Sequence, residues 1–375
     1  MRLHQIDALR GFALFGILMV NIFVFHAPYA YYGQFYGQFT GTEKMVLDNM
    51  IFFFGGKFMF IYAFLFGYSF WLQYQKWQDK QAFRRFWNRR MWLLAGFGVL
   101  HILLLSFGDI LLPYALLGLS LPFFARLRLR WILLSFLLIY LIPVYEFVLR
   151  GFFDFPSVFM QPVTELDSYI EINRQGSALE IFGLRLRDYF SLVSEKLVMY
   201  MPKEISLFLV GMLAGRAELA NKIKVRHGLL FCVFAVLVVG GMYFYRPNLI
   251  AFFDYKNSVI QRTVLGLAIH FYEFMHGGLY IVGFFLLWKL PLLQKALWPL
   301  TYTGKLSLTN YIGQSLICLI LFSGLDYYGQ LTPSQLVIWV LVTYAAQLVC
   351  SILWLRYYQQ GPLEHVWRKY SKRGG

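Results

Sequence analysis

The feature that most constrains the fold is a series of apolar runs, each close to twenty residues long, that recurs along the chain. As a helix, a run of this length spans the hydrocarbon core of a bilayer. None of the runs shows the strict ten-residue alternation of a membrane β-barrel strand. The predicted fold class is therefore all-α, a polytopic membrane helix bundle in a single domain over residues 1–375. Ten spans are predicted, at residues 8–28, 50–73, 91–107, 109–125, 131–149, 192–215, 228–245, 264–288, 299–323 and 334–356.

The composition favours the same class. Only 14% of the 375 residues are charged and 59% are hydrophobic, whereas a soluble domain carries about 25% charged residues. The mean hydropathy is +0.56. Cys232, Cys318 and Cys350 lie in separate apolar runs, which gives neither a disulfide framework nor the spacing of a metal site.

Lysine and arginine are concentrated in every second connection, after the second, fourth, sixth, eighth and tenth predicted spans. The positive-inside rule places these connections, and with them both termini, in the cytoplasm. Basic loops facing anionic lipid account for the net charge of +15, so nucleic acid is not an expected partner.

Two polar segments lie outside the predicted spans. Residues 150–191 carry mixed charge and are predicted to form an extracytoplasmic connection with an amphipathic helix. Residues 357–375 are predicted to form a cytoplasmic tail. Within this tail, GPLEHVWRK (Gly361–Lys369) predicts a helix on the lipid surface.

Ionisable residues inside a span are costly and usually face the interior of the bundle, so they are candidate site residues. In the first span, Asp7 and Arg10 share a helix face and can pair. Arg10 could bind a phosphate or carboxylate at a cytoplasmic mouth, or the pair could simply anchor the helix. Asn21 is expected near the middle of the bilayer. His26 is expected near the outer end, as an interfacial or a catalytic histidine.

His101 and Asp109 lie in GVLHILLLSFGDILLPYALLG (Gly98–Gly118). His101 is expected roughly 15 Å into its span, where a histidine can act as base, nucleophile or proton relay. Asp109 could cap the following helix. A continuous helix would separate the two residues by about 12 Å, so a contact would need the break that Gly108 and Pro113 allow.

Further polar residues lie in later spans. His270, Glu273 and His276 are spaced three apart, a pattern that fits a proton relay or interhelical contacts better than a metal site, for which H-E-x-x-H spacing is expected. Asn310 and Gln314 form a stripe that could line a cavity or bond neighbouring helices. The residues predicted to line a substrate cavity are Asn21, Lys57, Glu273, His276, Lys305 and Asn310.

Six ordered stretches resemble the YeiB-type bacterial membrane proteins, which carry domain of unknown function 418. They are DALRGFALFGILMVN (Asp7–Asn21), FMFIYAFLFG (Phe58–Gly67), HILLLSFGDILLPYALLG (His101–Gly118), LFLVGMLAGR (Leu207–Arg216), GKLSLTNYIGQS (Gly304–Ser315) and GPLEHVWR (Gly361–Arg368). The first stretch is also similar to the opening of a wider membrane acyltransferase group that includes heparan-α-glucosaminide N-acetyltransferase. That resemblance implies transfer of an acyl group from cytoplasmic acyl-CoA to an acceptor across the bacterial inner membrane. A histidine after the first helix is important in that enzyme, and His26 is its nearest positional counterpart.

Two functions are consistent with these residues. In an acyltransferase, Arg10, Arg89 and Arg90 would bind the phosphates of acyl-CoA, and Asp7 would orient Arg10. His101 would be the base or nucleophile, and Asp109 and Lys57 would meet a small-molecule or glycan acceptor. In a proton-coupled transporter, His101, Glu273 and His276 would instead carry protons. A scaffold or sensor subunit is a third reading, and the sequence does not specify the acceptor or the oligomeric state.

Overall fold

The computed structural model describes residues 3–28, 31–142, 165–195, 200–252 and 259–372, and these residues form helices and connecting loops without a strand. This confirms the predicted all-α class for the described chain. The helices are α1 (His4–His26), α2 (Tyr32–Gly37), α3 (Gly41–Phe54), α4 (Lys57–Tyr74), α5 (Lys80–Leu104), α6 (Leu111–Gly118), α7 (Leu121–Phe124), α8 (Leu129–Tyr140), α10 (Leu166–Gln175), α11 (Ala178–Glu195), α12 (Met201–Arg216), α13 (Leu219–Lys222), α14 (Val225–Phe252), α15 (Val259–Trp288), α16 (Pro291–Leu297), α17 (Leu300–Lys305), α18 (Ser307–Leu319), η3 (Ile320–Gly324), α19 (Pro333–Tyr357) and α20 (Pro362–Lys372).

Six helical segments of the described chain are long and apolar enough to cross a membrane. They are His4–His26, Gly41–Tyr74, Val225–Phe244, Gly266–Trp288, Ser307–Gly324 and Pro333–Tyr357. The other four predicted spans also fall on helices, namely α5, α6 with α7, α8 and α12. These helices are shorter, except α5, whose first three turns carry five cations. Residues 143–149 of one predicted span, 196–199 of another and 150–164 of the predicted connection lie outside the described residues.

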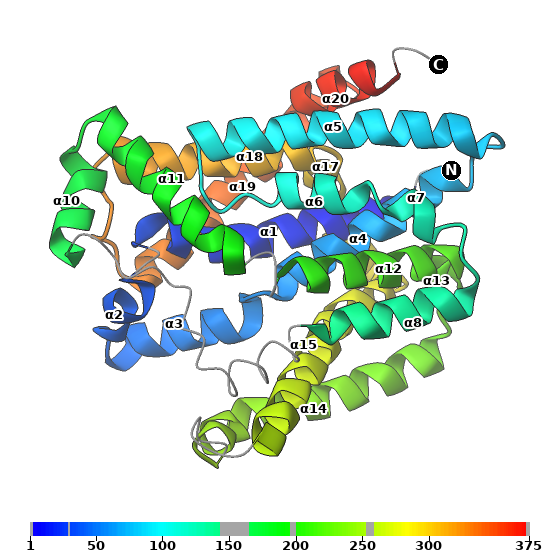
Figure 1. Cartoon of the computed structure of the whole chain (residues 1–375), viewed down its shortest axis with the longest axis horizontal. Coiled ribbons are helices and arrows are strands. Elements are labelled where there is room, and N and C mark those ends of the chain that lie inside the picture. Colours follow the sequence, from blue (N-terminus) through cyan, green and yellow to red (C-terminus); the bar gives the residue numbers. More distant parts are fainter. Residues whose placement is uncertain (1–2, 29–30, 143–164, 196–199, 253–258, 373–375) are drawn as a thin grey trace.

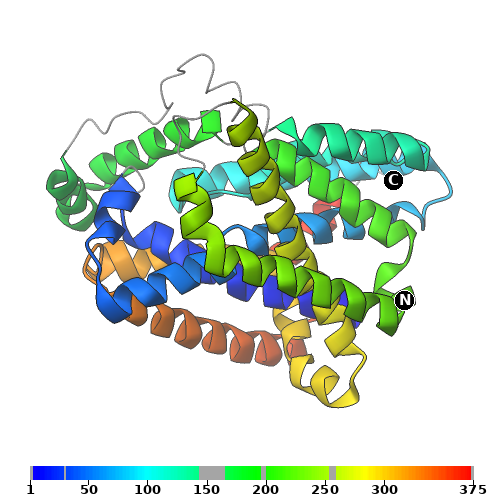
Figure 2. The same cartoon turned by 90° about the horizontal axis from the view of Figure 1, so that it is seen from below.

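Most long helices run along the long axis of the molecule, and both chain ends lie at the same end of it (Figures 1 and 2). The connection from α4 to α5, which contains Lys76, lies at this end, whereas α2 and α10 lie at the opposite end (Figure 1). The arrangement is the one expected when helices cross a bilayer along the long axis and the chain enters and leaves on one side.

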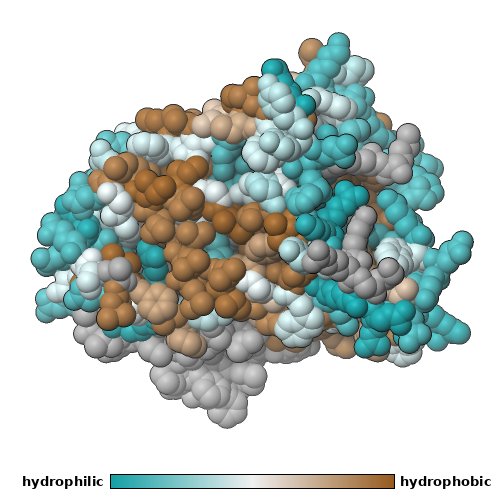
Figure 3. Space-filling view, turned by 90° about the horizontal axis from the view of Figure 1, so that it is seen from above, coloured by the Kyte–Doolittle hydropathy of each residue, from teal (hydrophilic) through white to brown (hydrophobic). Residues whose placement is uncertain are grey.

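The outer surface of the bundle is apolar where lipid would touch it. Large hydrophobic side chains are exposed along α5, α8, α14 and α19, among them Trp92, Leu137, Leu237 and Val342. Seen from above, hydrophobic side chains gather in a broad area between hydrophilic ends (Figure 3). A bundle that exposes its apolar side chains in this way matches a membrane environment rather than water.

Close helix crossings hold the centre of the bundle together. A Cβ on Gly67 of α4 would lie 1.9 Å from the carbonyl oxygen of Phe208, and one on Gly211 of α12 would lie 1.9 Å from that of Phe64. On the other side of α1, a Cβ on Gly304 would lie 1.8 Å from the carbonyl oxygen of Asp7. Because lipid offers no hydrophobic drive between helices, such backbone contact between small residues is a main source of packing energy.

Candidate functional site

The most deeply buried ionisable pair of the described chain joins α5 to the segment before α6. Nδ1 of His101 lies 3.0 Å from Oδ1 of Asp109, and the two side chains are 1% and 0% exposed. On the opposite side of the imidazole, Nε2 lies 2.8 Å from the hydroxyl oxygen of Ser315 on α18. The ring of Tyr311, one turn earlier on α18, packs on the imidazole with the ring centroids 5.2 Å apart. Protein groups therefore surround His101.

The end of α5 brings the pair together. The helix stops at Leu104, and the carbonyl of His101 accepts from the backbone N–H groups of both Leu105 and Ser106. The chain then reverses, so that Asp109 returns alongside the turn it has just left. The Asp109 carboxylate also accepts from the backbone N–H of Leu112, at 2.7 Å, in the first turn of α6. The two roles considered for Asp109, helix-end acceptor and partner of His101, are therefore combined in one side chain.

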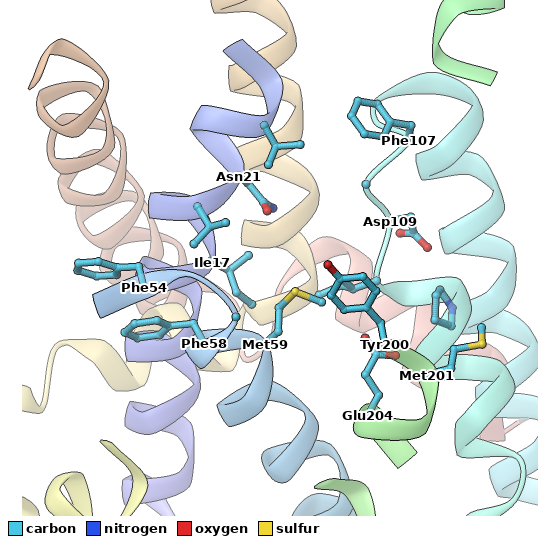
Figure 4. Close-up of a pocket in the computed structure, with 16 residues that line it drawn as sticks. Ile17, Asn21, Phe54, Phe58, Met59, Phe107, Asp109, Tyr200, Met201 and Glu204 are labelled. Carbon is cyan, nitrogen blue, oxygen red and sulfur yellow. The ribbon is translucent and has the colours of Figure 1, made fainter. Parts of the chain in front are cut away.

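A small cavity of about 160 Å³ lies on one side of this pair. Asp109 lines it from the loop before α6, Asn21 from α1, and Tyr200 and Glu204 from the beginning of α12 (Figure 4). Most of the remaining lining is apolar, including Ile17, Phe58 and Met59. Asp109, Glu204, Tyr200 and Asn21 are thus the polar residues of an otherwise apolar lining, which suits a small polar ligand.

A larger cavity of about 500 Å³ is lined by residues from both ends of the chain, from Arg10 of α1 to Trp367 and Arg368 of α20. Four basic side chains line it: Arg10, Arg90, Lys305 and Arg368. Tyr311 and Ile110 also line it, and Ile110 borders the small cavity as well. His101 lines neither cavity, but two residues that contact it line one cavity each, Asp109 the small one and Tyr311 the large one.

Helix α20 forms one wall of the larger cavity. The Glu364 carboxylate accepts from the backbone N–H groups of Leu308 and Thr309, at 2.7 and 3.1 Å, and thereby caps the N-terminus of α18. The indole N–H of Trp367 donates to the carbonyl of Arg90, and the Arg90 guanidinium lies 3.5 Å from the centre of the indole ring. One face of α20 thus packs against α5 and α18, because its glutamate and tryptophan find protein partners, while Val366 and Tyr370 remain exposed. Contact of this exposed face with the lipid surface stays a prediction.

The residues predicted to bind an acyl-CoA occupy different places. Arg10 pairs with Asp7, with 2.9 Å between Nη1 and Oδ1, and donates to the Ser69 hydroxyl. Arg10 and Arg90 line the larger cavity, but Arg89 is exposed and does not. Consecutive helix residues diverge by about 100°, so only one of the two arginines of α5 can face the cavity.

His26 is fully buried at the far end of α1. Its Nδ1 lies 3.1 Å from the hydroxyl oxygen of Tyr36, and its Nε2 accepts from the backbone N–H of Leu331 at 2.9 Å. Its carbonyl accepts from the N–H of Gly329. These contacts join α1 to α2 and to the segment before α19, which is a structural role for the histidine in the described state.

The remaining predicted cavity residues fall into separate groups. Asn21 lines the small cavity and Lys305 the large one. Asn310 donates to Ser351 and to the carbonyl of Thr303, in a polar contact between α18 and its neighbours. The other three lie around α15 and its neighbours: Glu273 pairs with Lys203, His276 lies 3.1 Å from each of two tyrosine hydroxyls, and Lys57 lies over Tyr272. Lys57, Glu273, His276 and Asn310 line neither cavity.

Sequence reasoning missed three residues of the site. Ser315 and Tyr311 directly follow Gln314 and Asn310 in the sequence and lie on the adjacent face of α18, and neither was singled out from the sequence. Arg368 was assigned to a lipid-surface helix. In the part of the chain that the structure describes, no group of three or more histidine, cysteine or acidic side chains is arranged to hold a metal.

Fold and site together define a helical membrane protein with an acid–base pair buried beside two cavities. The model of the family described as protein of unknown function (DUF418) matches residues 214–374. The uncharacterized protein YxaH of Bacillus subtilis (strain 168) is 28% identical over 98% of this chain and 93% of its own length. The uncharacterized protein YeiB of Escherichia coli (strain K12) is 25% identical over 98% of this chain and 96% of its own length. These matches confirm the resemblance to YeiB-type proteins that was predicted from the sequence.

Proposed function

We propose that this protein is a membrane acyltransferase that takes an acyl group from acyl-CoA and delivers it to a small polar acceptor. The observation that carries the proposal is the position of the His101–Asp109 pair, which stands beside a basic cavity on one side and a small acidic cavity on the other. A transferase for two substrates of unlike charge needs such a pair of sites with one reactive group between them.

The larger cavity suits the donor. Arg10, Arg90 and Arg368 offer planar guanidinium groups, which bind phosphate groups in a bidentate manner. Glu364 is the acidic residue of the lining, and its carboxylate is already engaged by the N-terminus of α18. The volume of about 500 Å³ falls in the range of roughly 300–1,000 Å³ for small-molecule sites.

The pair supplies the acid–base chemistry. A carboxylate beside Nδ1 favours the tautomer that carries its proton there, which leaves the lone pair on Nε2. Asp109 would also stabilise the imidazolium that forms when Nε2 takes a proton from the attacking group. An acceptor hydroxyl or amine in the small cavity could hydrogen-bond to Glu204 and Asn21.

We further infer that the end with the termini faces the cytoplasm of the bacterial inner membrane. Support comes from the basic connections at that end, and from the larger cavity, because CoA thioesters are cytoplasmic. Impermeant thiol labelling of single cysteines placed at residue 78 and at residue 175, in intact cells and in inside-out vesicles, tests this orientation. Labelling of residue 78 from outside would contradict it.

The donor site is tested by calorimetry with CoA on the purified, detergent-solubilised protein. Arg90→Ala is expected to weaken CoA binding about tenfold to a hundredfold, because a charged hydrogen bond contributes roughly 1.5–3 kcal/mol. The matched control is Arg89→Ala on the same helix, which removes an exposed arginine and leaves the affinity unchanged. Transfer of radiolabel from acetyl-CoA to sugars that carry free hydroxyl or amino groups is then measured with and without His101→Ala. No CoA binding by the wild-type protein at millimolar concentration overturns the proposal.

The proton-coupled transporter is the other outcome of these tests. It would require Glu273 and His276 to act with His101, yet Glu273 pairs with Lys203 and His276 with tyrosines. Uptake into proteoliposomes that is driven by a pH gradient, proceeds without CoA and is lost in Glu273→Gln would favour the transporter over the enzyme.

A further inference from the structure

The hydroxyl of Ser315 has a geometry that the proposed acid–base role of His101 does not by itself explain. Its oxygen lies 2.8 Å from Nε2 of His101, and the residue is 2% exposed. The carbonyl of Tyr311, one turn back on the same helix, is a second acceptor for this hydroxyl at 3.5 Å, which is too long for a strong bond. The short contact is therefore the one to His101.

The tautomer decides the direction of this contact. Oδ1 of Asp109 lies 3.0 Å from Nδ1, and in the tautomer that carries the ring proton on Nδ1, Nε2 has a lone pair and no hydrogen. Ser315 must then be the donor and His101 the acceptor. The first proton that the imidazole can take in this arrangement is the proton of Ser315, since the lone pair points at that hydroxyl.

A hydroxyl, an imidazole and a carboxylate in this order form the arrangement of an activated nucleophile, its base and the group that orients the base. The arrangement is recognised by its geometry and occurs on unrelated folds. Here three different segments contribute to it: Ser315 from α18, His101 from α5 and Asp109 from the loop before α6.

We propose that Ser315 is the nucleophile that accepts the acyl group, so that transfer passes through an acyl-serine ester. This inference rests on the proposed acyltransferase function and names the covalent route within it. The Ser315 oxygen attacks the thioester carbonyl carbon while its proton passes to Nε2 of His101. The C–S bond breaks, and the CoA thiolate leaves with the proton from Nε2.

The second half of the reaction restores the serine. An acceptor hydroxyl attacks the ester carbonyl and gives its proton to Nε2. The ester C–O bond breaks, and the Ser315 oxygen regains that proton as it leaves. No oxidant or further reactant is needed. Ser315 and His101 line neither cavity, but both lie next to residues that do: Tyr311 lines the donor cavity and Asp109 the acceptor cavity. An ester on Ser315 would therefore be buried between the two cavities, which would protect it from hydrolysis.

Acyl-enzyme trapping tests this route. The full-length protein is incubated with radiolabelled acetyl-CoA without acceptor, denatured, and analysed by mass spectrometry of its peptides. The wild type is expected to retain close to one label per chain on Ser315, and Ser315→Ala to retain none. Ser315→Cys is expected to form a thioester that neutral hydroxylamine releases, whereas the serine ester resists it.

A control variant distinguishes loss of the nucleophile from loss of the fold. Ser206→Ala removes an equally buried helix hydroxyl, which donates to the carbonyl of Pro202 at 2.7 Å, and is expected to label as the wild type does. Initial-rate kinetics of the wild type should give the parallel lines of a ping-pong mechanism.

The outcomes distinguish this proposal from the one it rests on. The role of Ser315 would be overturned if the wild-type protein transferred the acyl group without retaining label and its double-reciprocal plots gave intersecting lines, and if Ser315→Ala kept a rate within about threefold of the wild type. The proposed acyltransferase function would then still hold. A wild-type protein that neither binds CoA nor transfers an acyl group would overturn both.

Discussion

His101 and Asp109 lie side by side, with 3.0 Å between Nδ1 and Oδ1, although a continuous helix would hold residues at that separation about 12 Å apart. The contact exists because α5 ends at Leu104 and the chain folds back before α6 begins at Leu111. Space for the returning loop comes from Gly98, where a Cβ would lie 2.5 Å from the backbone nitrogen of Leu112 and 2.9 Å from Oδ2 of Asp109.

Replacing the Asp109 carboxylate by an amide should lower the rate of acyl transfer without unfolding the protein. In Asp109→Asn the neutral side chain no longer stabilises the imidazolium or fixes the tautomer, so acyl transfer is expected to fall by about a thousandfold or more. CoA affinity should stay within about threefold, because the donor cavity is untouched. The control is Asp48→Asn, at an exposed aspartate of α3, which should change neither quantity. Full transfer activity in Asp109→Asn would contradict the role of the pair.

Two glycines of α5 provide a matched test of how closely the loop before α6 packs against this helix. Gly98→Ala is expected to lower the free energy of unfolding by about 1–3 kcal/mol, because the methyl group meets backbone that cannot easily move. Gly96→Ala meets nothing within 4 Å and is expected to be neutral or to stabilise α5 by up to about 1 kcal/mol. Thermal unfolding in detergent compares the two variants. Equal midpoints would show that the loop does not depend on Gly98.

The Glu364 carboxylate, which caps the N-terminus of α18, should control the packing of α20 against the rest of the protein. Glu364→Gln removes the negative charge at the helix N-terminus and is expected to cost about 1–2 kcal/mol of docking energy. Hydrogen exchange of Pro362–Lys372 should become roughly tenfold faster, and CoA binding should weaken because α20 carries Arg368. Lys369→Ala, on an exposed position of the same helix, serves as the control. Unchanged exchange in Glu364→Gln would contradict this coupling.

Acidification should tighten the packing of α10 against α11 around Asp188, a residue that lies outside the predicted spans. Burial raises the pKa of Asp188 from 3.8 to about 6, and the Tyr169 hydroxyl contacts this carboxyl. The folded state therefore binds the proton more tightly than the unfolded chain. The stability of this packing is highest below pH about 4, falls as the pH rises to about 6 and then levels off.

Hydrogen exchange of α10 and α11, corrected for the intrinsic pH dependence, measures this effect at pH 5 and pH 7. Protection is expected to be greater at pH 5 in the wild type. In Asp188→Asn the difference between the two pH values should disappear. The same difference in both proteins would assign the pH dependence to another group.

The sequence by itself determined the class of fold. Apolar runs of span length, with basic residues in every second connection, predict a bundle of membrane helices, because backbone groups without hydrogen-bond partners are too costly in lipid. It also determined that burying His101 within a membrane helix costs free energy, and that Arg10 and Asp7 share one helix face.

Only the tertiary structure decided which polar residues meet. A helical periodicity orients side chains within one helix, but it does not say where a helix stops or which neighbour faces it. Asp109 therefore reached His101 through a chain reversal, and Ser315 reached it from a helix more than two hundred residues away. For the same reason Arg90, and not Arg89, lines the larger cavity, since packing of α5 against α20 sets the rotation of the helix.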